Sequence, residues 1–277
     1  MKIKVLVDNM PHPEKPSLVA EHGLSFYVET RHEKILLDVG ASDKFMRNAH
    51  NLGIEIADVD VLVLSHAHKD HTGGLAHFLQ NNSKAKVYLS ANINGSGYYS
   101  NRRKDMRDIS IDYGLLMDDK ERFEPVADNI WLSPAVRIIG KIPVGHSLPK
   151  ADGTLFAGDS PDTFNHEIAL LITEGDQTVL MSSCTHLGLL NTLEACAPVV
   201  PRVFIGGLHL VDSDEDNCFE SDEDYASMAE MINSRYPGMH IYTGHCTGSR
   251  AKCVLKSLLP DHFHVFYTGY EWKYPSD

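Results

Sequence analysis

Six consecutive residues, HAHKDH at positions 66–71, bring three histidines and an aspartate together. They directly follow the apolar run VDVLVLS, which is typical of a strand buried on both faces. His66 and His68 are two residues apart, so an extended backbone points both rings to one side. Asp70 and His71 follow where the chain turns. Imidazole and carboxylate groups bind metals, and two adjacent ligand pairs on one turn predict two metal ions about 3.5–4 Å apart.

An exposed loop that happens to be rich in histidine is the alternative for this segment. We do not favour it, because four titratable groups at the end of a buried strand carry a solvation cost unless something coordinates them. The glycines at positions 73 and 74 leave room for another stretch of backbone close to the cluster.

The rest of the chain supplies the elements that must position this cluster. Strands are predicted at residues 3–8, 24–30, 34–39, 59–65, 85–90, 168–173, 178–183, 203–207, 240–243 and 264–268. Helices are predicted at residues 43–53, with Ser42 as N-cap, and at 73–80, 225–236 and 248–259. Early hairpins followed by strand–helix alternation predict central sheets with helices outside them.

We expect a single domain over residues 1–277, with residues 92–150 as its irregular part. That stretch shows little periodicity. An insertion or lid over a site and a plain surface excursion both remain open for it.

Composition narrows the class of partner to a small molecule. The formal net charge of -13 argues against nucleic acid, whose binding proteins carry a basic face. No apolar stretch has the length that a membrane span needs, and the start lacks the features of a signal peptide. Five scattered cysteines favour the reducing cytoplasm over a disulfide framework. The oligomeric state stays open.

Much of the negative charge lies in one acidic segment, residues 212–224. We interpret it as a solvated loop that leads into a helix with Ser221 as N-cap, since carboxylates are favourable near a helix N-terminus. A cation site in the loop is the alternative.

The histidine cluster also carries a family resemblance. HAHKDH matches the His-x-His-x-Asp-His signature of the metallo-β-lactamase superfamily, and LLDVG at residues 36–40 resembles its early Asp-Gly segment. The resemblance implies an α/β fold: an αββα four-layer sandwich of mixed sheets with helices outside and metals at one edge. It also implies that Asp38 lies beneath the ligand loop and supports it.

A closer resemblance covers most of the chain. The chain resembles the subgroup named after a dihydropterin methyl-ribofuranosyl-aminobenzene-phosphate synthase, whose members are mostly known only as metal-dependent hydrolases of uncertain substrate. The matching segments are VLVDNM near the start, EHGLSFYVE (21–29), LSHAHKDHTGGL (64–75), SSCTHLGLLNTLE (182–194), IGGLHL (205–210) and GHCTG (244–248).

The resemblance implies two further metal ligands from later strand ends. His186 follows a predicted strand and is expected to complete one metal site, and His245 is expected to join Asp70 and His71 at the other. The superfamily carries a bridging aspartate where this chain has SSCTH. Cys184 lies nearest that position, and both a bridging thiolate and an inert buried thiol are open for it.

Another segment imitates the superfamily's middle motifs. VGHSLPKADGTLFAGD, at residues 144–159, would offer His146 and Asp159 as ligands. No convincing pair of strands lies between these two residues, whereas two good strands lead up to His186, so we favour His186. His166 opens the first of those strands and is expected at the edge of the site, as a substrate contact or a ligand.

Four remaining residues are assigned to catalysis or substrate. His209 follows an apolar strand and two glycines, and we expect it to protonate a leaving group or contact the substrate. Its alternative is a core histidine bonded to backbone. Tyr98 and Arg102 could contact an aromatic or anionic substrate, the alternative being a solvated loop. His22 is a weaker candidate for the pocket.

The leading hypothesis is a metal-dependent hydrolase, with two divalent ions, zinc before manganese or iron, activating a water molecule. Asp70 would accept a hydrogen bond from that water. The substrate would be small and anionic: a phosphoester, a lactone or a related ester. The alternatives are a pterin-related synthase, which the subgroup's name implies, and a metal-stabilised ligand sensor without turnover. A redox reaction with iron ranks below these because the carboxylate bridge is missing.

Overall fold

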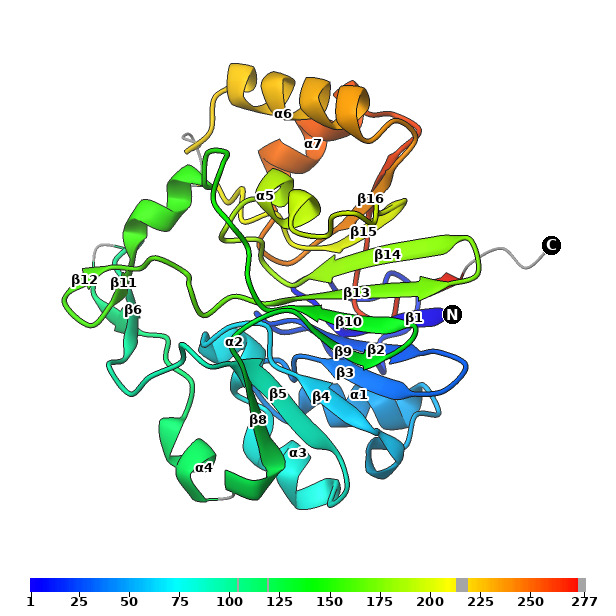
Figure 1. Cartoon of the computed structure of the whole chain (residues 1–277), viewed down its shortest axis with the longest axis vertical. Helices are drawn as coiled ribbons and strands as arrows, with labels where there is room; N and C mark the ends of the chain where they lie inside the picture. Colours follow the sequence, from blue (N-terminus) through cyan, green and yellow to red (C-terminus); the bar gives the residue numbers. More distant parts are fainter. Residues whose placement is uncertain (104, 119, 213–218, 274–277) are drawn as a thin grey trace. The chain divides into compact units, whose positions relative to one another are not determined.

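The computed structural model describes residues 1–103, 105–118, 120–212 and 219–273 and divides into two compact units (Figure 1). Unit 1 comprises Met1–Tyr99, Asp108–Ala127 and Phe266–Asp277, and unit 2 comprises Ser100–Arg107 and Asp128–Val265. Each unit contains one seven-stranded mixed sheet. The single domain expected over the whole chain stays a prediction.

The sheet of unit 1 is antiparallel on one side and parallel on the other. Its strands run in the order β18 (Glu271–Lys273), β1 (Lys2–Val7), β2 (Ser25–Glu29), β3 (Lys34–Leu37), β4 (Val61–Val63), β5 (Lys86–Ser90) and β8 (Phe123–Val126). Neighbours from β18 to β3 pair antiparallel, and neighbours from β3 to β8 pair parallel. The parallel strands therefore end at one edge, where the histidine cluster begins.

The helices of unit 1 are short. They are α1 (Lys44–Asn51), which packs against β1, α2 (Lys69–Thr72), α3 (Leu75–Asn81) and α4 (Tyr113–Asp118), with single 3-10 turns at Ile56–Asp58 and Lys120–Arg122. The prediction that Ser42 is the N-cap of α1 is wrong, because Asp43 occupies that position. The Ser42 hydroxyl instead donates to Oε2 of Glu21 at 2.6 Å.

The sheet of unit 2 has the same two-sided pattern. Its strands run in the order β17 (Phe263–Val265), β16 (His240–Thr243), β15 (Val203–Gly206), β14 (Gln177–Ser182), β13 (Ala169–Glu174), β10 (Val136–Ile139) and β9 (Ile130–Ser133). Neighbours from β17 to β14 are parallel, and neighbours from β14 to β9 are antiparallel.

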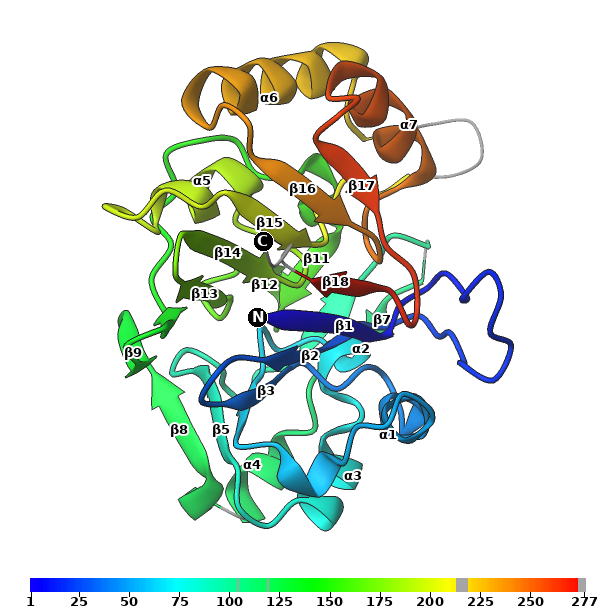
Figure 2. The same ribbon diagram turned by 90° about the vertical axis from the view of Figure 1, so that its right-hand side faces the viewer.

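Helices α5 (Leu189–Glu194), α6 (Asp222–Arg235) and α7 (Ser249–Leu258) belong to unit 2, and α6 packs on α7, which in turn contacts β17 (Figure 2). A 3-10 helix at Lys150–Thr154 leads into the small antiparallel pair β11 (Leu155–Ala157) and β12 (Ser160–Pro161). Ser221 caps α6 as expected, in a capping box with Asp224. The rest of the acidic segment, 213–218, lies outside the described residues.

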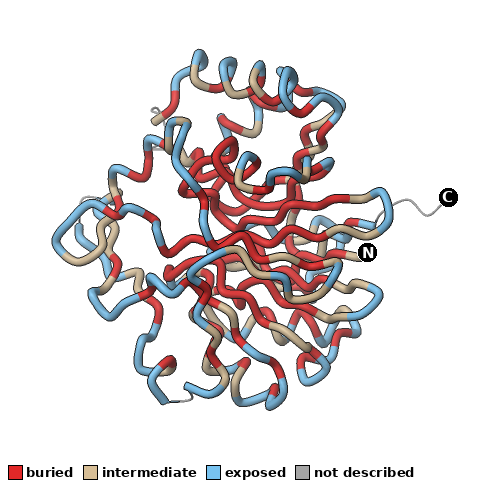
Figure 3. Tube along the Cα trace, in the orientation of Figure 1, coloured by how far each residue is buried: buried red, intermediate tan, exposed pale blue. Residues whose placement is uncertain are grey.

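Each strand expected from the sequence is present, and most bounds agree within one or two residues. The run at 59–65 forms a shorter strand than expected, β4, although its flanking residues are also buried. The central strands of both sheets are almost entirely buried (Figure 3). No helix among the described residues is long and apolar enough to cross a membrane.

Residues 92–150 are more regular than their sequence indicates. They contain β6 (Tyr98–Ser100), β7 (Arg107–Asp108) and three strands, β8, β9 and β10, that belong to the two large sheets. For residues 123–139 the interpretation as an irregular insertion or lid is therefore wrong. The signal is weak there because these strands are four residues long and β8 contains Pro125, which is tolerated because β8 is an edge strand.

Candidate metal centre

The ligand cluster of unit 1 lies on the segment that joins β4 to α2. His66 and His68 follow β4, His68 is the N-cap of α2 with an extended backbone, and His71 lies within the helix. All three histidines are buried. The ring centroid of His66 is 4.5 Å from that of His68 and 4.3 Å from that of His71. The local chain therefore brings the three imidazole rings close together, whereas the spacing predicts that His71 aims at a second point with Asp70.

Asp38 is the carboxylate that orients this cluster. It is fully buried, follows β3, and has a left-handed backbone with φ of 62°. Its Oδ1 accepts the Ser65 N–H at 2.7 Å, while Oδ2 accepts the Ser65 hydroxyl at 2.6 Å and lies 2.8 Å from His71 Nδ1. A carboxylate accepts hydrogen bonds, so Nδ1 of His71 carries the proton and Nε2 is the ring nitrogen that would bind a metal.

Ser65 passes the same orientation on to His66. Its hydroxyl donates to Asp38, so its oxygen accepts from Nδ1 of His66, 2.8 Å away. His66 and His71 are therefore held in the same tautomer, with Nε2 as the metal-binding atom. Such second partners fix the orientation and raise the basicity of metal-bound histidines, which makes Ser65 a functional residue that the sequence analysis missed.

A glycine allows the backbone approach that this network needs. A Cβ on Gly74 would lie 2.3 Å from the carbonyl oxygen of Val39. The Val39 N–H in turn donates to the carbonyl oxygen of His71 at 2.9 Å. The loop after β3 and the ligand segment are thus pressed together.

Three other candidates of unit 1 surround the cluster. Asp70 Oδ2 lies 3.6 Å from His71 Nε2 and 3.5 Å from Nε2 of His22, whose side chain is 73% exposed. Tyr98 is buried, with its ring centroid 6.1 Å from that of His68. Tyr98 therefore packs against the candidate ligand His68. The alternative from the sequence, a solvated loop, would have left its side chain exposed.

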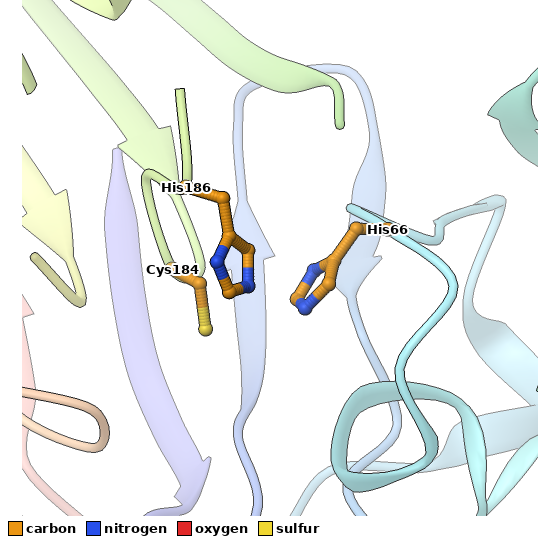
Figure 4. Close-up of side chains that lie close together, drawn as sticks. All are labelled: His66, Cys184 and His186. Atoms are coloured by element: carbon orange, nitrogen blue, oxygen red, sulfur yellow. The ribbon is translucent and has the colours of Figure 1, made fainter. Parts of the chain in front are cut away.

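In unit 2, Cys184 and His186 lie on the loop that follows β14, and Figure 4 draws both side chains. Glu167 holds this loop, because its two carboxylate oxygens accept the N–H groups of His186 and Leu187 at 2.9 and 2.8 Å. Burial raises the pKa of Glu167 to about 8, against the effect of those two hydrogen bonds. Glu167 therefore shapes the ligand loop.

Asp152 connects two of the candidate histidines. Its Oδ1 accepts a hydrogen bond from His186 Nδ1 at 2.8 Å and lies 2.6 Å from His209 Nδ1. The other nitrogen of His209, Nε2, accepts from the Arg102 guanidinium at 3.1 Å, because arginine can only donate. Burial raises the pKa of Asp152 to about 9, with Arg102 acting in the opposite direction. Asp152 thus orients His186 as Asp38 orients His71, and the sequence analysis missed it.

The remaining ligand candidates of unit 2 also lie at strand ends. His245 follows β16 and is buried. His166 is buried too, and its Nε2 lies 3.0 Å from Asp162 Oδ2, an acid that the sequence analysis did not select. Cys246 follows His245 in the chain. Burial acts to raise the pKa of its thiol, but a hydrogen bond with Cys184 and the nearby His245 outweigh this effect and lower the pKa.

His146 and Asp159 are not placed with the other histidines of unit 2. His146 Nε2 lies 2.8 Å from Glu194 Oε1, beside Arg235, and Asp159 is exposed in the turn between β11 and β12. The preference for His186 over His146 agrees with this arrangement.

Backbone strain is concentrated at these sites. Every described non-glycine residue with positive φ either is a candidate site residue or is next in chain or space to one; they are Asp38, Phe164, Thr185, His209 and His245. The left-handed region costs roughly 1–2 kcal/mol for most residues and is found at functional sites. The strand ends are therefore built to aim these side chains.

The donor set suits borderline and harder divalent ions. It consists of imidazole nitrogens and a carboxylate, which favour zinc and also accept manganese or iron. Within unit 1, ligand atoms of Asp38, His66 and His71 all lie within 4.8 Å of one another. The orienting bonds to the imidazole Nδ1 atoms are those expected around a bound metal.

The comparisons with known proteins agree with this geometry. Residues 18–207 match the family model described as the metallo-beta-lactamase superfamily, and the chain belongs to that superfamily. It is 24% identical to the 7,8-dihydropterin-6-methyl-4-(beta-D-ribofuranosyl)-aminobenzene-5'-phosphate synthase of Methanocaldococcus jannaschii, covering 90% of this chain and 89% of the relative. An uncharacterized protein of the same organism, MJ0448, is 27% identical, covering 92% and 94% of the two chains.

The fold is also that of solved structures. The crystal structure of Tm1679, described as a metal-dependent hydrolase of the beta-lactamase superfamily, superposes with a TM-score of 0.81 at 24% identity over 100% of both chains. A diphosphatase from the PhnP family gives a TM-score of 0.55 at 15% identity, covering 99% and 98%. The expected α/β, metallo-β-lactamase-like fold of mixed sheets and helices is confirmed.

Proposed function

We propose that this protein is a metal-dependent hydrolase that acts on a small anionic ester, such as a phosphoester or a lactone-derived substrate. Two divalent ions, zinc in first place, would be held by His66, His68, Asp70, His71, His186 and His245. The observation that carries the proposal is the Asp38–Ser65 network, which holds His66 and His71 in the tautomer that a metal requires.

Bound metal ions would supply an activated water molecule and polarise the substrate oxygen. Asp70 is the carboxylate that accepts a hydrogen bond from the attacking water and orients it, since its side chain is partly exposed. Arg102 binds the negative charge of the substrate. His209 holds a proton on Nδ1 against Asp152, and Nε2 faces Arg102. A substrate anion that draws Arg102 away would free Nε2 of His209 to take up the proton that the attacking water loses and to donate it to the leaving group.

A bond-forming synthase is the second candidate. It is supported by the likeness to the dihydropterin synthase over most of both chains. The same ligand set would then activate a substrate rather than water. A ligand sensor without turnover is the non-enzymatic alternative, and Asp70→Asn separates it from both enzymes, because a sensor would lose ligand binding only as far as it loses metal.

The proposal is tested by elemental analysis of the purified protein beside two ligand variants, His68→Ala and His186→Ala. We expect close to two equivalents of metal in the wild type and less in both variants. The matched control is His77→Ala, an exposed histidine of α3, which should retain the full content. The metal found is then used to assay phosphoester, lactone and dihydropterin substrates. A protein that neither contains nor takes up metal would contradict both enzyme proposals.

A further inference from the structure

Unit 2 contains a cavity that is lined by none of the proposed metal ligands. It has a volume of about 580 Å³ and lies between residues 145–150, the start of α5, the segment after β15 and one face of α6. Cavities of this size hold small organic ligands. Gly188 lies two residues beyond His186, and Leu208 and Leu210 flank His209, so the cavity borders the candidate site residues of this unit.

The walls of the cavity are largely apolar. Seven leucine or methionine side chains line it: Leu148, Leu189, Leu190, Leu208, Leu210, Met228 and Met231. The α6 residues that line it, from Asp224 to Met231, recur at helical spacing and form one stripe, while Tyr225, Ala229 and Ile232 are buried on another. Methionine adapts to ligands of different shape. The walls therefore suit an apolar body.

The charged groups of the wall differ in their contacts and in their burial. Lys150 Nζ is paired with Asp224, and His146 lies beside Glu194 and Arg235. Glu220 differs from these groups in its burial, because only 6% of its surface is exposed.

The two oxygens of Glu220 are not equally satisfied. Oε1 accepts the Lys150 N–H at 2.7 Å, but Oε2 is buried without any hydrogen-bond partner among the described residues. Burial raises the pKa of Glu220, and the hydrogen bond from the Lys150 N–H and the charge of Lys150 offset this only in part. An unsatisfied buried oxygen destabilises the folded protein, and a ligand with an N–H donor would remove that cost.

We propose that this cavity binds a small organic cation, whose apolar body lies against the leucine and methionine walls and whose protonated amine donates to Oε2 of Glu220. The inference stands apart from the proposed hydrolase, because the ligand is recognised by a carboxylate and apolar walls, without any metal. The inference goes beyond the proposed function because it assigns a second binding site, next in the chain to His186 and His209.

The test measures binding to the full-length, metal-loaded protein by titration calorimetry. Three probes share one bicyclic body and differ in charge: naphthylmethylamine, naphthylmethanol and naphthoate. We expect the amine to bind at least about tenfold more tightly than the alcohol, since hydrogen bonds to charged groups are the stronger ones. Naphthoate should bind least, because its charge repels Glu220.

Two variants and one control locate the site. Glu220→Gln should reduce the amine to the affinity of the alcohol and leave the alcohol unchanged. Met228→Trp should weaken all three probes by filling the cavity without touching Glu220. Glu223→Gln, an exposed acid in the first turn of α6, is the matched control and should bind as the wild type does.

Three outcomes would overturn the proposal. They are equal affinity for amine and alcohol in the wild type, an amine preference that survives in Glu220→Gln, and no binding of any probe. A thermal melt of each variant confirms that it is folded. Should Glu220→Gln not fold, the probe preference of the wild type together with Met228→Trp still decides the question.

Discussion

Two buried carboxylates, one in each unit, contact imidazole rings in the same way. Asp38 lies 2.8 Å from Nδ1 of His71, and Asp152 lies 2.8 Å from Nδ1 of His186. In both cases the carboxylate sets the tautomer and turns Nε2 toward the side where a metal would bind. The chemistry of this protein therefore depends on residues that would not touch the metal themselves.

The two carboxylates differ in how well a sequence can show them. Asp38 lies in LLDVG, which resembles a family motif, and its role was expected. Asp152 lies 34 residues before His186 in a segment that resembles other motifs through His146 and Asp159. Ser65 was missed although it directly precedes His66. Only the fold shows which neighbour a side chain contacts. The sequence therefore offers candidate ligands, which stay predictions, but not most of the residues that contact them.

Asp152→Asn tests the orienting role at the scale of one residue. The amide keeps the size of the side chain but replaces one carboxyl oxygen of the group that contacts Nδ1 of His186 and Nδ1 of His209. We expect metal affinity to fall about 10–100-fold, as is typical when such a partner is lost, measured by competition with a chromophoric chelator. Asp176→Asn, an exposed acid in the turn after β13, is the control. Unchanged affinity in Asp152→Asn would show that His186 needs no orienting carboxylate.

At the scale of elements, the candidate residues lie where parallel strands end. The segments after β3, β4, β14, β15 and β16 carry Asp38, the HAHKDH cluster, His186, His209 and His245. Apolar runs followed abruptly by polar residues made these strand ends predictable. The missed strands β8 and β9 are edge strands, and β10 lies next to β9. Edge strands need less apolar sequence, so their pattern is weaker.

The β16–β17 pair also contains a histidine group without an assigned function. His240 Nδ1 lies 3.1 Å from His264 Nε2, and the ring of His262 lies 4.8 Å from that of His240. Burial and the neighbouring histidines lower the pKa of His240 and of His264, and Lys256 adds to the effect at His264. Protonation of this group is therefore unfavourable in the folded protein.

The pH dependence of stability should show this group. Because the folded-state pKa values are lowered, the unfolded chain binds more protons below about pH 6.5, the unperturbed value. Stability is fully present above that pH and is lost as pH falls toward the folded pKa values. We expect the urea concentration at the unfolding midpoint to decrease as the pH is lowered from about 6.5 to about 5. The slope of the free energy of unfolding against pH should be well below about 1.4 kcal/mol per pH unit, the value for one proton, because the rings are partly exposed and screened.

His264→Phe identifies the source of that slope. Phenylalanine retains the stacking on Tyr242, whose ring centroid is 4.5 Å from that of His264, but it does not titrate. The slope should be smaller in this variant than in the wild type. His32→Gln, at an exposed histidine of unit 1, should keep the wild-type slope. If both variants keep it, other groups dominate the acid response.

At the scale of the whole molecule, the two sheets repeat one design. In each sheet four strands pair parallel and the remaining three are antiparallel, and a hairpin leads into the parallel half: β2–β3 in unit 1 and β13–β14 in unit 2. Both place a carboxylate-oriented histidine beyond the parallel strand ends. This repetition was not visible as a sequence period, because pairing direction depends on contacts between strands far apart in the chain.

Metal binding makes a prediction for the stability of the whole protein. Each unit contains one tryptophan: Trp272 in β18 and Trp131 in β9. Trp131→Phe and Trp272→Phe therefore give proteins whose fluorescence follows one unit at a time. Metal at about 100 times its Kd should stabilise the folded state by about 2.7 kcal/mol. We expect both tryptophans to report this increase when metal is added back to chelator-treated protein.

A third substitution tests whether His186 belongs to the ligand set. If it does, His186→Ala should weaken the metal-dependent stabilisation that the tryptophans report. His146→Ala is the matched control, since that histidine lies in unit 2 beside Glu194 and outside the proposed ligand set. A metal effect confined to Trp272 and unaltered by His186→Ala would instead mean that the HAHKDH cluster holds its metal alone. The ligands proposed from unit 2 would then have to act on the substrate.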